Sequence, residues 1–151
     1  PQEKLDSLAF PLDERWYSRI KTTWLRSRDG GVRMHTGMDV RCNHGSPIYA
    51  CAGGTVNSIG YHVKGGYYVS IVDADGYEYF YYHLKKNSQC VARGQTVETG
   101  ERIGLSGNTG NSAAPHLHLC VITPERRFVD PFPIYYRWVY QHTGRFIKKP
   151  S

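Results

Sequence analysis

Between Gly37 and Val129 the sequence consists of short apolar or β-branched runs that are separated by Gly, Asn, Asp and Pro residues. Runs of this length, bounded by turn-forming residues, are typical of β-strands. No helical segments of about 10–15 residues alternate with the runs, which argues against a parallel α/β sheet. We therefore expect a mainly β fold with an antiparallel sheet or sandwich core, whose candidate strands are 38–41, 47–51, 54–60, 66–73, 76–83, 102–105 and 116–122.

The turns and the length of the chain agree with one compact domain. The segment Asp73-Ala74-Asp75-Gly76 is predicted to be a hairpin turn between two of the strands. The chain has 151 residues, enough for one domain to bury about two thirds of its unfolded surface. Its 16 Gly and 12 Tyr residues suit a β-rich fold with many turns.

The two ends of the chain carry different patterns. Trp16, Tyr17, Ile20 and Trp24 recur at near-helical spacing, which indicates a short helix or a strap packed on the core. From Ile134 to Ser151 aromatic residues are mixed with Arg and Lys. This tail is predicted to form a helix or strand that closes one end of the core, with a basic-aromatic contact surface as the alternative.

Four histidines and one aspartate lie in three short motifs, His35-Thr36-Gly37-Met38-Asp39, Tyr82-His83-Leu84 and Pro115-His116-Leu117-His118. Neutral histidine is the commonest protein ligand of zinc, and a carboxylate is an accepted third partner. Three protein ligands with a fourth position left for water define a catalytic zinc site. His83 is expected at the end of a strand, after the aromatic run from Tyr77 to Tyr82.

Strand geometry constrains how these side chains can converge. Residues two apart share one face of a strand, so His116 and His118 point the same way, and either is a plausible ligand. An extended step from His35 to Asp39 would cover roughly 13 Å, too far for both to bind one metal. We therefore expect a bend at Thr36–Gly37, followed by a strand that starts near Met38.

With these motifs the chain resembles the lysostaphin- and LytM-type zinc endopeptidases, which cut peptidoglycan peptides. The resemblance runs from about Arg33 to Pro131. The segments that carry it are 33–40, Gly45-Ser46-Pro47-Ile48-Tyr49-Ala50, Gly53-Gly54-Thr55-Val56, Tyr82-His83-Leu84, Gly94-Gln95-Thr96-Val97, Gly100-Glu101-Arg102-Ile103-Gly104, Gly107-Asn108-Thr109-Gly110, Pro115-His116-Leu117-His118 and Val129-Asp130-Pro131.

The resemblance implies which residues bind the metal and which are catalytic, a distinction that the spacing alone leaves open. His35, Asp39 and His118 would bind one Zn²⁺, and His83 and His116 would be the catalytic pair. No H-E-x-x-H motif supplies a glutamate base. One of the two histidines would then accept the proton of the zinc-bound water, and one would hydrogen-bond the oxyanion. Which histidine has which role stays open.

An open substrate groove is also expected, floored by the sheet and walled by loops near 42–46, 60–66, 85–92 and 107–114. Tyr61, His62, Tyr68 and Asn108 are candidate substrate-binding residues along it. His44, His62 and His142 are individually more typical of surface or hydrogen-bonded histidines than of ligands.

Three segments depart from the family pattern. They are Asn111-Ser112-Ala113-Ala114 before the last motif, Trp24–Gly31 before Arg33, and Cys120, which stands where an acidic residue usually follows the H-x-H strand. None includes a predicted ligand, so the departures bear on substrate preference and local packing.

The domain organisation expected is an N-terminal strap (1–32), a peptidase core (33–131) and a C-terminal extension (132–151) within one domain. The expected function is zinc-dependent hydrolysis of a peptide bond in peptidoglycan stem peptides or cross-links. The alternative is a catalytically inactive relative that binds peptidoglycan or activates another hydrolase. Such relatives usually lose site residues, whereas all five are retained here.

Charge, cysteines and hydropathy bear on location and partners. The net charge of +6 suits solubility or attraction to an anionic envelope, and the scattered basic residues form no nucleic-acid motif. The four cysteines, Cys42, Cys51, Cys90 and Cys120, predict two disulfides. Proximity in the sequence suggests the pairs Cys42–Cys51 and Cys90–Cys120. Disulfides in turn predict a periplasmic or extracellular protein. No apolar run of membrane-spanning length and no secretory signal are visible, so the chain is expected to be a mature or trimmed form. It is expected to act as a monomer or within a larger envelope-penetrating assembly.

Overall fold

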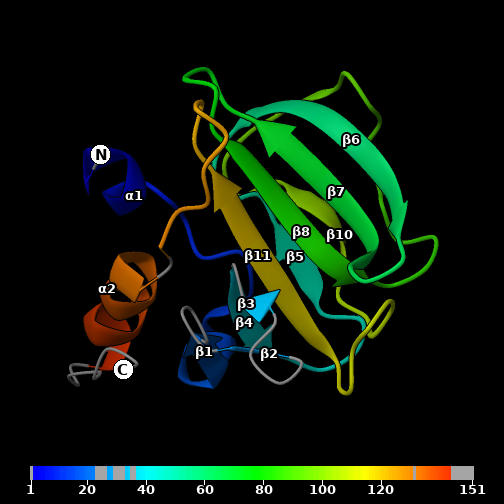
Figure 1. Cartoon of the computed structure of the whole chain (residues 1–151), viewed down its shortest axis with the longest axis horizontal. Coiled ribbons are helices and arrows are strands. Elements are labelled where there is room, and N and C mark those ends of the chain that lie inside the picture. The colour runs from blue at the N-terminus through cyan, green and yellow to red at the C-terminus, as the bar shows by residue number, and fades with distance from the viewer. Residues whose placement is uncertain (1, 23–26, 29–32, 35–36, 131, 144–151) are drawn as a thin grey trace.

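A computed structural model of the chain describes residues 2–22, 27–28, 33–34, 37–130 and 132–143 (Figure 1). The helical elements are α1 (Gln2–Asp6), the 3₁₀ helix η1 (Glu14–Arg19) and α2 (Phe132–Thr143). The strands are β1 (Ile20–Thr22), β2 (Ser27–Arg28), β3 (Arg33–Met34), β4 (Met38–Arg41), β5 (Pro47–Tyr49), β6 (Gly54–His62), β7 (Gly66–Val72), β8 (Glu78–Leu84), β9 (Thr96–Val97), β10 (Arg102–Leu105) and β11 (His116–Ile122). None of the described helices is long and apolar enough to span a membrane.

The main layer is a seven-stranded sheet in the order β1-β4-β11-β8-β7-β6-β9. Every pairing recorded in it is antiparallel, as the sequence predicted. A two-stranded ribbon, β10-β5, lies behind this sheet, and β2 pairs with β3 (Figure 1). The predicted mainly β, antiparallel fold class is therefore confirmed.

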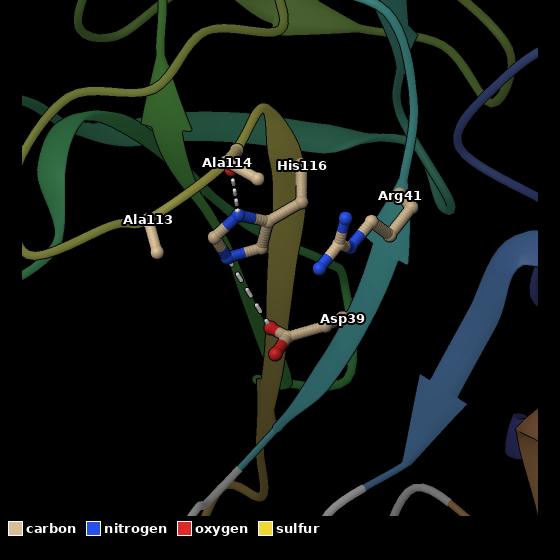
Figure 2. A pocket seen from close by; sticks show the side chains of 5 residues that line it. All are labelled: Asp39, Arg41, Ala113, Ala114 and His116. Carbon is tan, nitrogen blue, oxygen red and sulfur yellow. Dashed lines mark hydrogen bonds and ion pairs between the residues drawn. The ribbon is translucent and has the colours of Figure 1, made fainter.

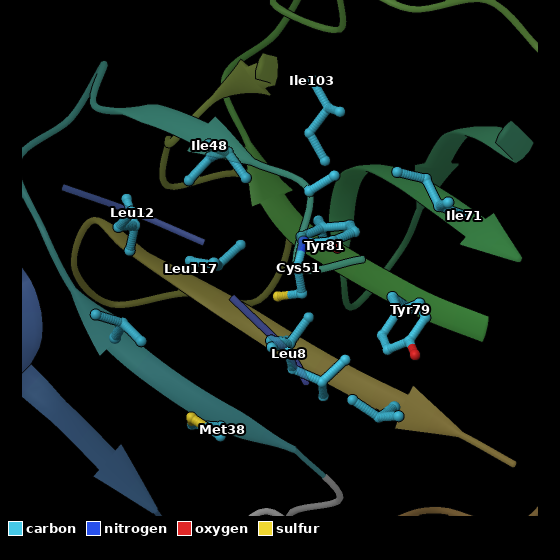
Figure 3. Packing of buried hydrophobic residues seen from close by; sticks show 14 of the residues in the cluster. Leu8, Leu12, Met38, Ile48, Cys51, Ile71, Tyr79, Tyr81, Ile103 and Leu117 are labelled. Carbon is cyan, nitrogen blue, oxygen red and sulfur yellow. Dashed lines mark hydrogen bonds between the residues drawn. The ribbon is translucent and has the colours of Figure 1, made fainter. Parts of the chain in front are cut away.

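The two faces of the large sheet have opposite characters. Side chains of one parity, such as Val40, Leu117 and Tyr81, are completely buried. They pack in one apolar cluster with Ile48 and Ile103 of the β10-β5 ribbon, which closes the core from behind (Figure 3). Because successive strand residues point to opposite faces, the side chains between them lie on the open face of the same sheet.

The predicted hairpin turn joins β7 and β8. The carboxylate of Asp73 accepts hydrogen bonds from the backbone N–H groups of Asp75 and Tyr77 and from the hydroxyl of Tyr79. Gly76 has φ +89°, in the left-handed region that glycine adopts without strain. Lys4 of α1 also binds Asp73, at 2.9 Å, so this turn anchors the N-terminal helix as well.

The N-terminal segment runs as a strap between the ribbon and α2. Leu8 and Leu12 are buried in the core, and Ala9 donates its N–H to the carbonyl of Cys51 at 2.9 Å. The carbonyl of Leu8 accepts a hydrogen bond from Nε1 of Trp138 in α2 at 3.2 Å. The near-helical spacing around Trp16 corresponds to η1, and Trp24 lies outside the described residues.

The tail forms a closing helix as far as Thr143. Ile134, Trp138 and Val139 of α2 are almost fully buried, which supports the closing-helix interpretation over a contact surface. Residues 144–151, with the remaining basic side chains of the tail, are outside the described part of the chain.

The predicted disulfides are not formed, since none of the four cysteines is linked to another. Cys51 lies in the core beside the hydroxyl of Tyr81, where burial raises the pKa of its thiol to about 12. The exposed Cys90 donates its thiol hydrogen to the carbonyl of Arg102, and Cys120 pairs with Phe80 on the open face of the sheet. A disulfide needs its two sulfur atoms about 2 Å apart, whereas the sulfur atoms of Cys90 and Cys120 contact the Arg102 carbonyl and the His118 ring instead.

Candidate metal centre and active site

The register of three neighbouring strands gathers the predicted site residues on the open face. Asp39 of β4 is directly opposite His118 of β11, and His118 is opposite Tyr82 of β8. One step along the ladder, Arg41 is opposite His116. Directly opposed residues have Cβ atoms about 4.5–5.5 Å apart, so segments distant in sequence meet in one small area.

The carboxylate of Asp39 is the centre of this area. Its Oδ1 atom lies 2.7 Å from Nδ1 of His118 and 3.6 Å from Nε2 of His116. Two donor atoms on one tetrahedral zinc ion are separated by roughly 3.3 Å, given bonds of about 2 Å. Asp39 and His118 are therefore near the spacing that a shared metal requires, with only small adjustments.

The third predicted ligand, His35, lies outside the described residues. Within the described part of the chain no cluster of three or more His, Cys, Asp or Glu side chains forms a complete metal site. The strand that was expected to start near Met38 is confirmed as β4, which places Asp39 on the open face directly after the His35–Gly37 segment.

Gly37 lies against the back of the His118 ring. A Cβ atom at this position would be 2.5 Å from the carbonyl oxygen of Leu119 and 2.7 Å from Nε2 of His118. Glycine is therefore needed here for close packing, in addition to the bend expected from sequence. Nε2 of His118 also lies 3.2 Å from the thiol of Cys120, so the ring is held with Nδ1 toward Asp39.

His83 lies near the end of β8, as predicted, and its backbone conformation there is unusual. Its φ is +63°, which is uncommon for a residue other than glycine and is often found at functional sites. The backbone N–H donates to the carbonyl of Gly65 at 2.7 Å, and the carbonyl accepts from the N–H of Gly107 at 3.0 Å. These two bonds fix the residue between two loops.

The His83 ring has a defined tautomer when neutral. Nδ1 lies 2.7 Å from the carbonyl oxygen of Thr109, and because a carbonyl can only accept, Nδ1–H is the donor. The lone pair of the neutral ring is then on Nε2. Burial lowers the pKa of His83 to about 4, with a smaller effect from the nearby His116 and His118 rings.

His116 is oriented in the same way. Its Nδ1 donates to the carbonyl of Ala114 at 2.8 Å and lies 3.2 Å from the hydroxyl of Ser112, which leaves Nε2 pointing at Asp39 (Figure 2). The ring centroids of His83 and His116 are 4.5 Å apart. The two predicted catalytic histidines are therefore in contact with each other and adjoin the Asp39–His118 pair.

A pocket opens beside this cluster. It is lined by Asp39, Arg41, Ala113, Ala114 and His116, and Figure 2 shows the Arg41 guanidinium beside the His116 ring. Ala113 and Ala114, from the 111–114 segment in which the sequence departs from the family pattern, thus supply one wall of the pocket.

Aromatic rings continue the open face of the sheet away from Asp39 and His118. The rings of Phe80 and Tyr82 are stacked at 5.6 Å, and Tyr68 contacts both from β7 at 6.2 and 5.6 Å. Tyr82 lies 6.0 Å from the His118 ring. Tyr68, a predicted substrate-binding residue, is therefore part of the continuous surface that leads to the site.

The other three predicted substrate-binding residues are distributed over the loops. Tyr61 is 56% exposed and packs edge-on against Tyr67. Nδ1 of His62 accepts the N–H groups of Lys64 and Gly65, which gives His62 a role in the β6–β7 turn. Asn108 accepts a hydrogen bond from the hydroxyl of Ser112 and so braces the 107–114 loop.

Arg41 and Thr109 were not recognised from the sequence as site residues. Arg41 is two residues beyond Asp39 on a predicted strand, so strand parity alone would have placed it on the same face. The contact of Thr109 uses its backbone carbonyl, and no side-chain pattern could have indicated it.

With this geometry established, comparison with known proteins identifies the family. Residues 33–131 match peptidase family M23, and the chain belongs to this family. The peptidoglycan DD-endopeptidase ShyA of Vibrio cholerae is 37% identical over 121 residues, which cover 78% of this chain and 27% of ShyA.

Two solved structures are similar over most of the chain. The catalytic domain of the antimicrobial peptidase lysostaphin from Staphylococcus simulans superposes with a TM-score of 0.71 at 29% identity, covering 82% of this chain and 98% of that domain. A zinc-containing peptidase from Vibrio cholerae gives a TM-score of 0.71 at 31% identity, covering 80% of this chain and 37% of that one. The chain spans 18–43% of the length of the first three curated relatives that it matches.

Proposed function

We propose that this protein is a zinc-dependent endopeptidase that hydrolyses a peptide bond in peptidoglycan stem peptides or cross-links. The observation that carries the proposal is the convergence of His118 and His116 on one oxygen of Asp39, with His83 in ring contact. Membership of peptidase family M23 and the similarity to a peptidoglycan endopeptidase and to lysostaphin support the same activity.

His35, Asp39 and His118 would hold the zinc ion. Imidazole nitrogen and carboxylate oxygen are ordinary zinc donors, and three such ligands leave a position for water or substrate. The name of one structural relative, a zinc-containing peptidase, supports this metal. When bound, zinc supplies an activated water and polarises the scissile carbonyl.

His83 is suited to accept the proton of the attacking water. Its neutral ring presents the Nε2 lone pair, because Nδ1–H is donated to Thr109. The lowered pKa keeps this ring neutral near pH 7, although a base with a pKa of about 4 holds the proton only briefly. Such a base suits transfer of the proton onward to the leaving amine.

His116 is suited to stabilise the oxyanion. Its Nε2 atom is 3.6 Å from Asp39, an ion-pair distance when the ring is protonated. A protonated ring there would donate Nε2–H toward the carbonyl oxygen of a peptide in the adjoining pocket.

Action on peptidoglycan would take place in the periplasm or outside the cell. A peptidoglycan peptide would be the substrate partner, with no nucleic acid involved. Whether the protein works as a monomer or in a larger assembly stays a prediction, as does the division into strap, core and extension.

The first experiment is a digest of peptidoglycan from several wall types by purified, zinc-loaded protein, read by mass spectrometry. New amino ends at one defined bond, lost after chelation and restored by zinc, are expected. His118→Ala should lose zinc and activity together, whereas His83→Ala should keep zinc and lose turnover. His142→Ala, which changes a histidine of α2 outside the site and its loops, is the matched control.

Two results would overturn parts of the proposal. Tight binding to the cell wall without cleavage of any bond would indicate an inactive binding or activating module. Full zinc occupancy in His118→Ala would show that the ligand set is wrong, whatever the activity.

A further inference from the structure

Arg41 is a charged side chain at the edge of the site that has no role in the fold. It is exposed at the end of β4, and its guanidinium lines the pocket shared by Asp39, His116 and the 113–114 wall (Figure 2). Over the described part of the chain, no hydrogen bond or ion pair to the Arg41 side chain is found. Because the guanidinium has no partner among these residues, it is available to a ligand.

Its position relative to the cluster is set by the sheet. Arg41 is opposite His116 and two residues from Asp39 on the same face. Two residues along a strand span about 7 Å. The guanidinium can therefore bind a substrate group that lies about 7 Å from the scissile bond. An extended peptide covers about 3.3–3.6 Å per residue, so a substrate group at Arg41 belongs to a residue within two positions of that bond.

The groups that line the pocket next to Arg41 favour a negatively charged ligand. The guanidinium offers a planar fork of N–H donors that matches the two oxygens of a carboxylate. Ala113 and Ala114 on the facing wall carry no charge or side-chain donor. Asp39, the acid in the lining, has its Oδ1 within reach of the two histidines, and it forms no ion pair with Arg41.

We propose that Arg41 binds a free carboxylate of the substrate peptide, one or two residues from the scissile bond. This contact makes the enzyme prefer the acid form of the peptide over the amidated form. The inference rests on the proposed function, because it assigns a specificity residue to that same site.

The test uses one cross-linked stem-peptide dimer in three forms. All carboxylates are free in the first, the side-chain diacid carboxylates are amidated in the second, and the C-terminal carboxylates are amidated in the third. The wild type should lose about 10- to 100-fold in kcat/KM on one of the two amidations, since a charge-assisted bidentate contact is removed. Arg41→Gln should lose a similar factor on the acid form and show little further loss on that amidated form.

Two variants make the comparison specific. Arg41→Lys keeps the charge without the fork and should recover only part of the preference. Arg93→Gln removes another exposed arginine, from the loop next to β6 at the far side of the sheet, and should leave the preference unchanged.

Binding of the same three peptides, measured by calorimetry, separates this inference from the proposed function. Tighter binding of the acid form that disappears in Arg41→Gln supports the inference even if the wild type cleaves no peptide. If amidation has the same effect in the wild type and in Arg41→Gln, or no effect in either, the inference is overturned while cleavage still supports the peptidase.

Discussion

Individual side chains in the site are set by contacts with the backbone of neighbouring loops. The rings of His83 and His116 each donate Nδ1–H to a carbonyl, of Thr109 and Ala114 respectively. The neutral His83 ring therefore carries its lone pair on Nε2, and the His116 ring directs its Nε2 at Asp39. The sequence predicted which histidines would meet, but a tautomer depends on a carbonyl from another loop, which no residue pattern encodes.

The buried position of His83 makes folding stability depend on pH. The pKa of the ring is about 4 in the folded protein and 6.5 in its ordinary state. Below pH 6.5 the His83 ring therefore becomes protonated in the unfolded chain, whereas in the folded protein it becomes protonated only near pH 4. We expect the free energy of unfolding to fall by up to about 3 kcal/mol from this group between pH 7 and pH 4.

His83→Gln isolates this effect, because the amide occupies similar space without titrating. Denaturant unfolding of both proteins in the presence of a chelator should show a steeper loss of stability for the wild type as the pH falls. Parallel curves for the two proteins would mean that His83 titrates normally in the fold.

Among the secondary-structure elements, most strands were predictable, including the short β4, β5 and β10, whereas β1, β2, β3 and β9 were not. The apolar runs from Gly54, Gly66 and His116 became β6, β7 and β11 with boundaries within two residues of the prediction at each end. β1, of three residues, was predicted instead as part of a helix or strap around Trp16 and Ile20. Its pairing with β4 is a contact between distant segments, so local pattern could not reveal it.

Two loops that carry the site are pressed against each other at their glycines. Gly110 has φ +76°, and a Cβ atom there would lie 2.3 Å from the backbone nitrogen of Gly66. The N–H of Asn111 donates to the carbonyl of Lys64 at 2.8 Å across the same contact. This contact holds Thr109 in place, and Thr109 orients the His83 ring.

We therefore expect Gly110→Ala to separate the loops. The substitution combines left-handed strain with a backbone clash, and should cost at least about 2 kcal/mol of stability. Turnover should fall at least about tenfold with zinc still bound, because a displaced His83 weakens proton transfer. Thermal unfolding, metal analysis and a peptide assay measure the three effects.

Gly94→Ala is a matched control for strain alone. Gly94 has a similar φ of +87°, but nothing lies within 4 Å of its added Cβ. It should cost about 1 kcal/mol and leave turnover unchanged. Equal losses of turnover in the two variants would show that the loop contact does not orient His83.

The molecule as a whole is held together by its two ends. Trp138 of α2 is 2% exposed, and its ring packs edge-on against Phe10 of the strap at 5.3 Å. The strap in turn hydrogen-bonds the β5 region, through the pairs Ala9–Cys51 and Pro11–Tyr49. A closing element at the C-terminus and an N-terminal strap packed on the core were both predicted, but no residue pattern indicated that the two would contact each other.

Trp138→Ala should consequently destabilise the whole domain by about 3–5 kcal/mol, the cost of a large core cavity. Tyr140→Ala, on the same helix but 40% exposed, should cost only about 1 kcal/mol. Cooperative loss of the sheet signal at lower denaturant in Trp138→Ala, followed by circular dichroism, would confirm the coupling. Unfolding of α2 alone, with the sheet unchanged, would contradict it.

The division of the large sheet into a buried face and an open face has a consequence for how this protein can evolve. Tyr81 and Leu117 are buried on one side of the layer, while Arg41, Tyr68 and Tyr82 lie on the other. Changes on the open face leave the apolar packing untouched, so selection can alter the recognised peptide with little loss of foldability. Under the proposed function, a lineage with this architecture can change the cell-wall bond that it cuts by exchanging a few side chains of the open face.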